Sequence, residues 1–217
     1  MKEVVKIENV TKKFKGEQVL KGVSLDLEPG KIYGIVGKNG SGKTVLFKCI
    51  IGLLKVTTGT IYVHDKNIGK ETDFAEDAGI IIEKPGFING YTGFENLKYL
   101  AEIRHIIGDS EIKKAMIDVG LEPESKKKTG KYSLGMKQKL AFAQAIMEKP
   151  QLLVLDEPMN GLDQESIKNI KQLLIGLKEK GTTILMSSHY LEDTEMCDEL
   201  YKMKDGKIYR LDDRQFN

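Results

Sequence analysis

The feature that most constrains this chain is a glycine-rich turn between two apolar runs. The turn reads Gly-x-x-x-x-Gly-Lys-Thr from Gly37 to Thr44, after the apolar run 32–36 and before the apolar run 45–54. Glycines allow successive backbone N–H groups to point inward, and a following helix directs its positive end at phosphates. The spacing therefore predicts a strand, a phosphate-binding loop and a helix that together hold a nucleoside triphosphate.

Two side chains of this loop have separate predicted tasks. We expect Lys43 to reach the β- and γ-phosphates and the Thr44 hydroxyl to bind Mg²⁺. A glycine-rich turn that happens to contain a lysine is the alternative, but an accidental match is rare and the flanking apolar runs make it rarer. The predicted nucleotide-binding residues of this segment are Gly37, Lys38, Asn39, Gly40, Ser41, Gly42, Lys43, Thr44 and Val45.

Length and charge limit the classes of protein to consider. A chain of 217 residues suits one sizeable domain. Its 34 basic and 32 acidic residues nearly balance, so no overall field favours nucleic acid or an anionic membrane. Cys49 and Cys197 are distant and the histidines are isolated, which favours the reduced thiols of a cytosolic protein over a disulfide framework or a zinc site. No apolar run reaches about 18 residues, so we expect membrane association only through a partner.

Apolar stretches of strand length alternate with stretches of helical periodicity. The alternation predicts a parallel α/β core interrupted by an all-helical insertion near 86–149, and an antiparallel sheet built around the phosphate-loop strand. The continuous apolar run 78–82 predicts a strand buried on both faces. Predicted strands cover 3–8, 18–27, 31–36, 59–64, 78–82, 152–155 and 182–186, and predicted helices cover 93–107, 110–119, 134–148 and 164–179.

Two carboxylates follow one of these strands directly. Ligands of open α/β sheets bind at the carboxyl ends of the strands, so Asp156 and Glu157 should face the same crevice as the phosphate loop. We expect Asp156 to hold Mg²⁺ and Glu157 to orient and deprotonate an attacking water. A plain surface turn before Pro158 is the weaker alternative.

Further motifs make the chain resemble the ATP-binding cassette (ABC) ATPases over nearly its whole length. The segment 132–138, Tyr-Ser-Leu-Gly-Met-Lys-Gln, resembles the family signature, which usually reads Leu-Ser-Gly-Gly-Gln, and the segments 159–163 and 187–189 match two further family loops in the family's order. The resemblance implies that Phe14 stacks on adenine, that His189 contacts the γ-phosphate, that a loop of Asn160, Gly161, Leu162 and Asp163 lies at a dimer contact, and that Ser133, Leu134, Gly135 and Met136 bind ATP held by a second subunit.

Each of these positions also has an ordinary structural interpretation. Ser133 could simply cap a helix, His189 could face solvent at a helix start, and Phe14 could be a core aromatic. The lysines and glycine around Phe14 indicate a surface loop instead. Leu134 and Met136 depart from the usual signature, whereas the hydroxyl of Ser133 and the glycine at Gly135 are kept.

Glu83 is the most distinctive departure from the family pattern. Most relatives carry a glutamine there whose carbonyl binds Mg²⁺, and a glutamate resembles the ATPase subunits of bacitracin- and lantibiotic-type resistance transporters. A carboxylate can bind Mg²⁺ too, but it adds a negative charge beside the phosphates. The alternative is an exposed loop glutamate paired with Lys84.

The resemblance implies a single ABC ATPase domain over 1–217. Its α/β fold would have a P-loop NTPase core at 1–85 and 150–217, an antiparallel β subdomain, and an inserted α-helical subdomain at 86–149. The expected cofactors are ATP and Mg²⁺, bound between two subunits that pair head to tail as a homodimer or heterodimer.

The implied function is the ATP-binding subunit of an ABC transporter. Hydrolysis would drive transport through separate transmembrane subunits that dock at 87–104, with export of an antimicrobial peptide as the suggested case. The subunit would then be cytoplasmic and peripheral to the inner face of the cell membrane, with no nucleic acid as partner. Two alternatives are a soluble ABC ATPase that acts on DNA or the ribosome, and a regulator that binds ATP without turnover. This sequence has neither the long coiled-coil insertion nor the second cassette expected of the soluble ATPase. Glu157 and His189 argue against the regulator.

Overall fold

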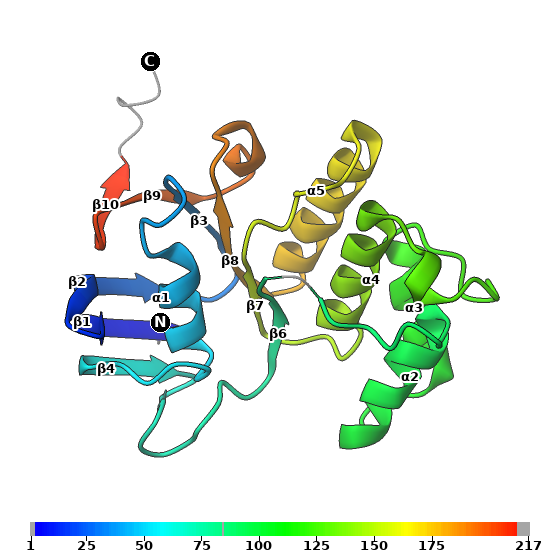
Figure 1. Cartoon of the computed structure of the whole chain (residues 1–217), viewed down its shortest axis with the longest axis horizontal. Coiled ribbons are helices and arrows are strands. Elements are labelled where there is room, and N and C mark those ends of the chain that lie inside the picture. Colours follow the sequence, from blue (N-terminus) through cyan, green and yellow to red (C-terminus); the bar gives the residue numbers. More distant parts are fainter. Residues whose placement is uncertain (1–2, 84, 212–217) are drawn as a thin grey trace.

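Two sheets and five helices make up the described part of the chain, which in the computed structural model comprises residues 3–83 and 85–211. Figure 1 shows the smaller sheet at one end of the molecule and the larger sheet across its middle. The smaller sheet is antiparallel, in the order β2 (Glu17–Leu27), β1 (Val5–Phe14), β4 (Thr58–Val63) and β5 (Lys66–Asn67). The larger sheet runs in the order β10 (Lys207–Leu211), β9 (Glu199–Lys204), β3 (Ile32–Val36), β8 (Thr183–Ser188), β7 (Leu152–Leu155) and β6 (Ala78–Ile81), parallel from β9 to β6.

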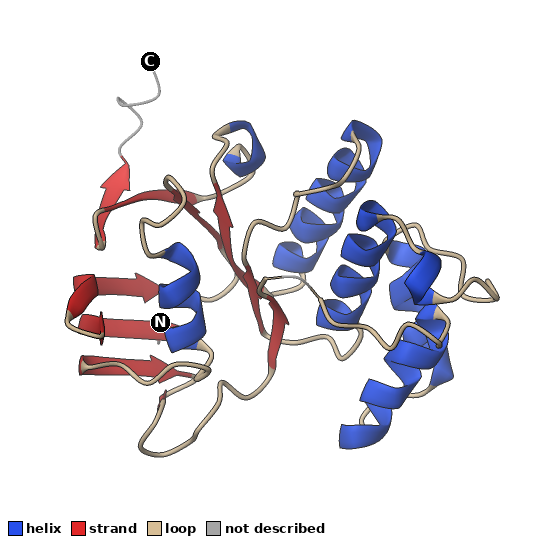
Figure 2. Cartoon of the chain, viewed as in Figure 1, coloured by secondary structure: helices blue, strands red, loops and turns tan. Residues whose placement is uncertain are grey.

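The helices separate into two groups. Helix α1 (Lys43–Ile50) lies between the two sheets, whereas the other helices lie on the opposite side of the larger sheet, as Figure 2 shows. That second group comprises α2 (Gly93–Arg104), α3 (Asp109–Asp118), α4 (Leu134–Ile146) and α5 (Gln164–Glu179), and the 3₁₀ turns are Thr129–Lys131 and Glu192–Thr194. Of the helices in the described ranges, none is both long and apolar enough to cross a bilayer.

The larger sheet divides the interior into two hydrophobic cores. Successive side chains of a strand point to opposite faces. Along β7, Leu152 and Val154 therefore join the core with α1, and Leu153 and Leu155 join the core with α4 and α5. Because all four are buried, both faces of this strand need apolar residues, which explains the uninterrupted run 152–155.

Helix starts are fixed by local hydrogen bonds. Thr92 and Glu95 form a capping box at the start of α2, and the side chains of Ser133 and Asp163 cap α4 and α5. Each cap satisfies a backbone N–H that has no partner within the helix. A cap is a local sequence signal. Helices α2, α4 and α5 accordingly begin at the predicted residues.

The structure corrects three details of the predicted sheets. The phosphate-loop strand β3 does not belong to the antiparallel sheet; its five buried residues lie between β8 and β9 in the larger sheet. Strand β6 is an edge strand, and its buried and half-buried residues alternate, so it is not buried on both faces. Phe14 ends a strand instead of lying in a surface loop, because pairing with β2 extends β1 to that residue.

Candidate nucleotide site

The phosphate loop joins β3 to α1 as predicted and surrounds one buried cation. Gly42 caps α1 with φ 110°, a left-handed conformation that favours glycine. The Lys43 ammonium donates to the Gly37 carbonyl at 2.6 Å and lies 3.4 Å from Glu157 Oε1, with only 5% of its side chain exposed. The loop residues Lys38, Asn39 and Gly40 are exposed, so the loop is open to solvent next to a buried positive charge.

Two polar atoms at this site have no hydrogen-bond partner among the described residues. They are the Ser41 hydroxyl, at the base of the loop, and Glu157 Oε1. Buried polar groups are normally hydrogen-bonded, and orphaned ones point to a ligand or water that completes them. A cradle of backbone N–H groups, one ammonium and a hydroxyl without a partner fits the phosphates of a nucleotide.

Oxygen donors that suit Mg²⁺ meet beside Lys43. The Thr44 hydroxyl donates to Asp156 Oδ2 at 2.5 Å, and the Ser187 hydroxyl donates to Asp156 Oδ1 at 2.5 Å. Thr44 opens α1, Asp156 follows β7 and Ser187 lies in β8, so three neighbouring elements contribute one group each. Hydroxyl and carboxylate oxygens are the donors that Mg²⁺ prefers, and Thr44 and Asp156 could therefore both hold it.

Glu157 is held from three directions. His189 Nδ1 lies 2.7 Å from Glu157 Oε2, Lys43 lies near the other carboxylate oxygen, and the Glu157 backbone N–H donates to the Ser187 hydroxyl at 2.9 Å. The backbone of Glu157 has φ 49°, which an ordinary residue adopts at a cost of about 1–3 kcal/mol. Strain of this kind persists where the surroundings fix a side chain, here a carboxylate beside the phosphate loop.

Glu83 makes its described ion pair with a lysine and not with the predicted metal donors. Its Oε1 is 2.5 Å from Lys48 Nζ, and 63% of its side chain is exposed. The described contacts of Thr44 and Asp156 do not include Glu83. The alternative of an exposed, paired glutamate named Lys84 as its partner, but Lys84 lies outside the described residues, and the pair that the structure contains is with Lys48.

Phe14 presents a partly exposed ring at the end of β1. The ring is 40% exposed, and Lys12 Nζ lies 4.9 Å from its centroid. An exposed aromatic face next to a cation is suited to stacking on a nucleobase, because the base adds a second π-face and the lysine favours negative groups nearby.

The signature segment packs against the loop that follows Glu157. Ser133 caps α4 by accepting from the Met136 N–H at 3.2 Å, and Leu134 is 60% exposed. A Cβ added to Gly161 would lie 2.6 Å from Leu134 Cδ2, and one added to Gly135 would lie 2.9 Å from the Gly161 carbonyl oxygen. The two predicted contact loops therefore touch each other within one subunit.

The rest of the predicted contact loop leads into α5. Asn160 is exposed and Leu162 is half-buried. Asp163 accepts from the Ser166 N–H and from its hydroxyl, at 2.8 and 3.0 Å, and these bonds hold the pKa of the Asp163 carboxyl below its ordinary value. This negative charge at the start of α5 also suits the positive end of the helix.

Comparison with known sequences decides the family. The family described as ABC transporter matches residues 20–160, well over half of the chain. This chain is an ABC transporter ATP-binding protein. The predictions of a P-loop NTPase fold and of an ABC-type ATPase are thereby confirmed.

Similar proteins and structures agree with this assignment. An uncharacterized ABC transporter ATP-binding protein, YybJ of Bacillus subtilis, is 40% identical over 94% of each chain. The bacitracin transport ATP-binding protein BcrA of Enterococcus faecalis is 42% identical over 96% of this chain and 68% of its own. Among solved structures, a dimer of the ATP-binding cassette MJ0796 with ADP and Pi has a TM-score of 0.85 and 25% identity, covering 96% of this chain and 99% of the other.

In this ABC ATPase, sequence reasoning missed the contact that Gln138 makes at the site. The buried Gln138 side chain donates to the Pro158 carbonyl at 2.7 Å and so ties α4 to the residue that follows Glu157. Gln138 lies in the signature segment, but helical periodicity does not predict which other segment its side chain contacts. A buried amide in an otherwise apolar helix face is the signal that could have drawn attention to it.

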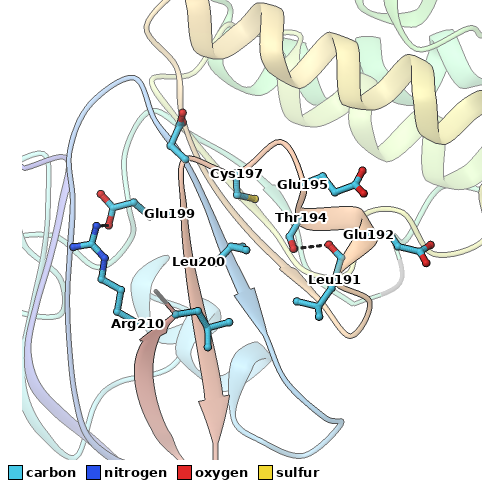
Figure 3. Close-up of a pocket in the computed structure, with 10 residues that line it drawn as sticks. Leu191, Glu192, Thr194, Glu195, Cys197, Glu199, Leu200 and Arg210 are labelled. Carbon is cyan, nitrogen blue, oxygen red and sulfur yellow. Dashed lines mark hydrogen bonds and ion pairs between the residues drawn. The ribbon is translucent and has the colours of Figure 1, made fainter. Parts of the chain in front are cut away.

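A large hollow of the ABC ATPase lies away from the phosphate loop. It has a volume of about 720 Å³, and Figure 3 shows it beside β9, with Cys197 on one wall and the Glu199–Arg210 ion pair of 3.2 Å at one edge. Burial raises the pKa of the Cys197 thiol to about 12, so this sulfur is a poor nucleophile. A second hollow, of about 540 Å³, is lined by the loop residues Gly37, Lys38 and Asn39 and by His189. Only the second hollow adjoins the chemistry described above.

The contact between Leu134 and Gly161 gives a stability test. We expect Gly161→Ala to lower the free energy of unfolding by about 1–2 kcal/mol through its positive φ of 79°. Overlap with Leu134 should add about 1–3 kcal/mol. Urea unfolding measures the total loss of unfolding free energy. Adding Leu134→Ala to Gly161→Ala should remove only the part of the loss that comes from overlap with Leu134. Gly176→Ala, in open space within α5, is the control and should stabilise by up to about 1 kcal/mol. Equal losses with and without Leu134 would contradict the packing argument.

Proposed function

We propose that this ABC ATPase hydrolyses ATP with Glu157 as general base and His189 as its positioning partner. The observation that carries the proposal is the chain of contacts from Lys43 through Glu157 to His189, next to the Thr44–Asp156 hydrogen bond. A base must lie within hydrogen-bond reach of the proton it takes, and Glu157 Oε1, which makes no hydrogen bond to a described residue, lies 3.4 Å from the Lys43 ammonium.

Each group then has one task at this site. Lys43 would leave the Gly37 carbonyl to contact the β- and γ-phosphates, and Glu157 would accept a proton from the attacking water while His189 holds its other oxygen. Thr44 and Asp156 would hold Mg²⁺, which supplies charge to the transferring phosphoryl group. Phe14 would stack on adenine.

We further propose that two subunits pair head to tail. The Ser133 hydroxyl, the exposed start of α4 and the exposed residues of the 160–163 loop lie together at one surface, where a helix N-terminus can receive the γ-phosphate of ATP from a second subunit. The dimeric cassettes among the structural neighbours support this arrangement.

The organisation of the chain supports a separate membrane partner. We propose a nucleotide-binding core at 1–85 and 150–217 and a helical subdomain at 86–149 that contains α2, α3 and α4. On α2 and in the segments on either side of it, large apolar side chains are exposed at Ile88, Tyr91, Tyr99, Ile103 and Ile106. Such clustering is typical of a protein–protein contact. Transmembrane subunits docked there would hold the ATPase at the inner face of the membrane.

For the transported compound, the relatives favour drug or peptide export. One is a bacitracin transport protein, and another is a fluoroquinolones export ATP-binding protein of Mycobacterium tuberculosis, 33% identical over 97% of this chain. We expect loss of this subunit to sensitise its host to a peptide antibiotic such as bacitracin, with fluoroquinolones as a second set. Growth inhibition assays on a deletion strain and on the strain complemented with the wild-type subunit measure this. Unchanged sensitivity to both classes would contradict the export proposal.

Phe14→Ala tests the adenine contact. Stacking of a base on an aromatic ring is worth about 1–3 kcal/mol, so the affinity for ATP should fall by about five- to 150-fold. Titration with a fluorescent ATP analogue measures this, and Phe14→Tyr should bind like the wild type because it keeps the aromatic face. The position ends β1 and is partly exposed, so the fold should remain intact. Equal affinity for Phe14→Ala and the wild type would exclude stacking.

A further inference from the structure

Lys48 contacts the one site residue that departs most from the family pattern. Its Nζ lies 2.5 Å from Glu83 Oε1, and 23% of the Lys48 side chain is exposed. The stem of Lys48 is therefore mostly covered while its charged end reaches the loop after β6. Neither sequence periodicity nor the P-loop pattern gives this residue a role.

Helix α1 places Lys48 one turn after Thr44, one of the predicted metal donors. Thr44 and Lys48 are four residues apart and therefore share one face of α1, with an axial separation of about 6 Å. On this face Thr44 contacts Asp156 and Lys48 contacts Glu83. One face of α1 thus contacts both acidic loops, the loop of Asp156 through Thr44 and the loop of Glu83 through Lys48, one helical turn apart.

The two acidic loops start side by side. Strands β6 and β7 pair with Ile81 opposite Leu155, and the Asp156 N–H donates to the Ile81 carbonyl at 2.6 Å. Glu83 follows two residues later with φ 58°, a left-handed bend that sends its side chain away from an extended path. The two carboxylates therefore differ in their side-chain partners, which are the hydroxyls of Thr44 and Ser187 for Asp156 and the ammonium of Lys48 for Glu83.

We propose that Lys48 is a positioning residue that holds Glu83 away from the metal site while no nucleotide is bound. Bound Mg²⁺ would then have to compete with the Lys48 ammonium for the Glu83 carboxylate. A glutamine at this position carries no charge and would gain little from Lys48, so the ion pair is specific to a chain with glutamate there. The proposal rests on the proposed function, because it requires Mg²⁺–ATP to bind at the phosphate loop.

The strength of the Lys48–Glu83 ion pair sets the size of the expected change in Mg²⁺ dependence. Ion pairs with exposed partners are weak, and a pair of this kind corresponds to a change of about two- to fivefold in a competing equilibrium. We expect Lys48→Met to lower the Mg²⁺ concentration for half-maximal binding of a fluorescent, non-hydrolysable ATP analogue by that factor. Binding of the same analogue without Mg²⁺ should change less, since Glu83 is not then required.

Three variants separate a positioning role from a merely structural one. Lys48→Arg should behave like the wild type because it keeps the charge. In a Glu83→Gln background, Lys48→Met should have no further effect on the Mg²⁺ dependence, since the pair is already broken. Lys66→Met, which breaks the exposed Lys66–Glu76 pair of 2.6 Å outside the site, is the matched control and should leave the Mg²⁺ dependence unchanged.

The outcomes distinguish this inference from the proposed function. A wild-type protein that binds no nucleotide analogue at any Mg²⁺ concentration would contradict the nucleotide site itself. Wild-type binding with an Mg²⁺ dependence that Lys48→Met leaves unchanged or weakens, or the same shift in the presence of Glu83→Gln, would overturn the role of Lys48 alone.

Discussion

Glu157→Gln is expected to abolish most hydrolysis while ATP still binds, so that ATP accumulates a stable dimer. A general base contributes about 10²- to 10⁴-fold to a rate, and glutamine cannot accept the proton. Glutamine keeps the shape and can still hydrogen-bond to His189, which lies 2.7 Å from the native carboxylate. It also removes a negative charge from beside Lys43, so ATP affinity should be kept or increase. Phosphate release and size-exclusion chromatography with ATP measure the two effects.

The matched control for this substitution is Glu179→Gln, at the end of α5 and exposed to solvent. It removes the same charge and should leave both hydrolysis and the ATP-dependent elution volume as in the wild type. If Glu157→Gln stays monomeric with ATP and hydrolyses at the wild-type rate, Glu157 is not the base.

Lys43→Ala should weaken ATP binding and slow turnover together. The buried Lys43 ammonium is the cation nearest the expected phosphates, and a charge-assisted hydrogen bond is worth about 1.5–3 kcal/mol, or about ten- to 150-fold in affinity. Turnover should fall by a further 10²- to 10³-fold or so, because the same charge is needed on the transferring group. Titration with a fluorescent ATP analogue and a phosphate-release assay check these expectations separately.

Folding must be verified for this variant because Lys43→Ala removes the lysine ammonium that lies 3.4 Å from the half-buried Glu157 carboxylate. A thermal unfolding curve serves this purpose, and Lys55→Ala, an exposed lysine beyond α1, is the charge-matched control. A folded Lys43→Ala protein with wild-type affinity and turnover would mean that the loop does not bind the triphosphate.

Local sequence patterns were sufficient for much of the fold. The glycine spacing from Gly37 to Gly42, the apolar run 152–155 with its two acids, and the cap of α5 at Asp163 each depend on residues within one turn or one strand. Backbone conformation over such short spans follows from the residue types themselves. The sequence therefore predicts the strands 31–36 and 152–155 within one residue of their observed bounds, although it assigns the first of them to the wrong sheet.

The end of the chain carries a local signal for a β-hairpin. Strands β9 and β10 were not predicted, although Asp205 and Gly206 have φ of 50° and 79° between residues of alternating burial. An Asp-Gly pair between such runs is a typical hairpin turn. This hairpin forms one side of the larger sheet and, through β9, pairs with the phosphate-loop strand.

Only the tertiary structure decided how distant parts of the site meet. The choice of sheet for β3, the Gln138–Pro158 hydrogen bond, the packing of Leu134 on Gly161 and the Lys48–Glu83 ion pair all join residues well separated in sequence. Spacing and periodicity describe the face a residue occupies on its own helix or strand, and they contain no information on which other element that face will meet. The sequence by itself therefore determined the chemical groups of the nucleotide site and the elements that carry them, whereas packing of those elements decided that Glu83 pairs with Lys48 and that Asp156 pairs with Thr44.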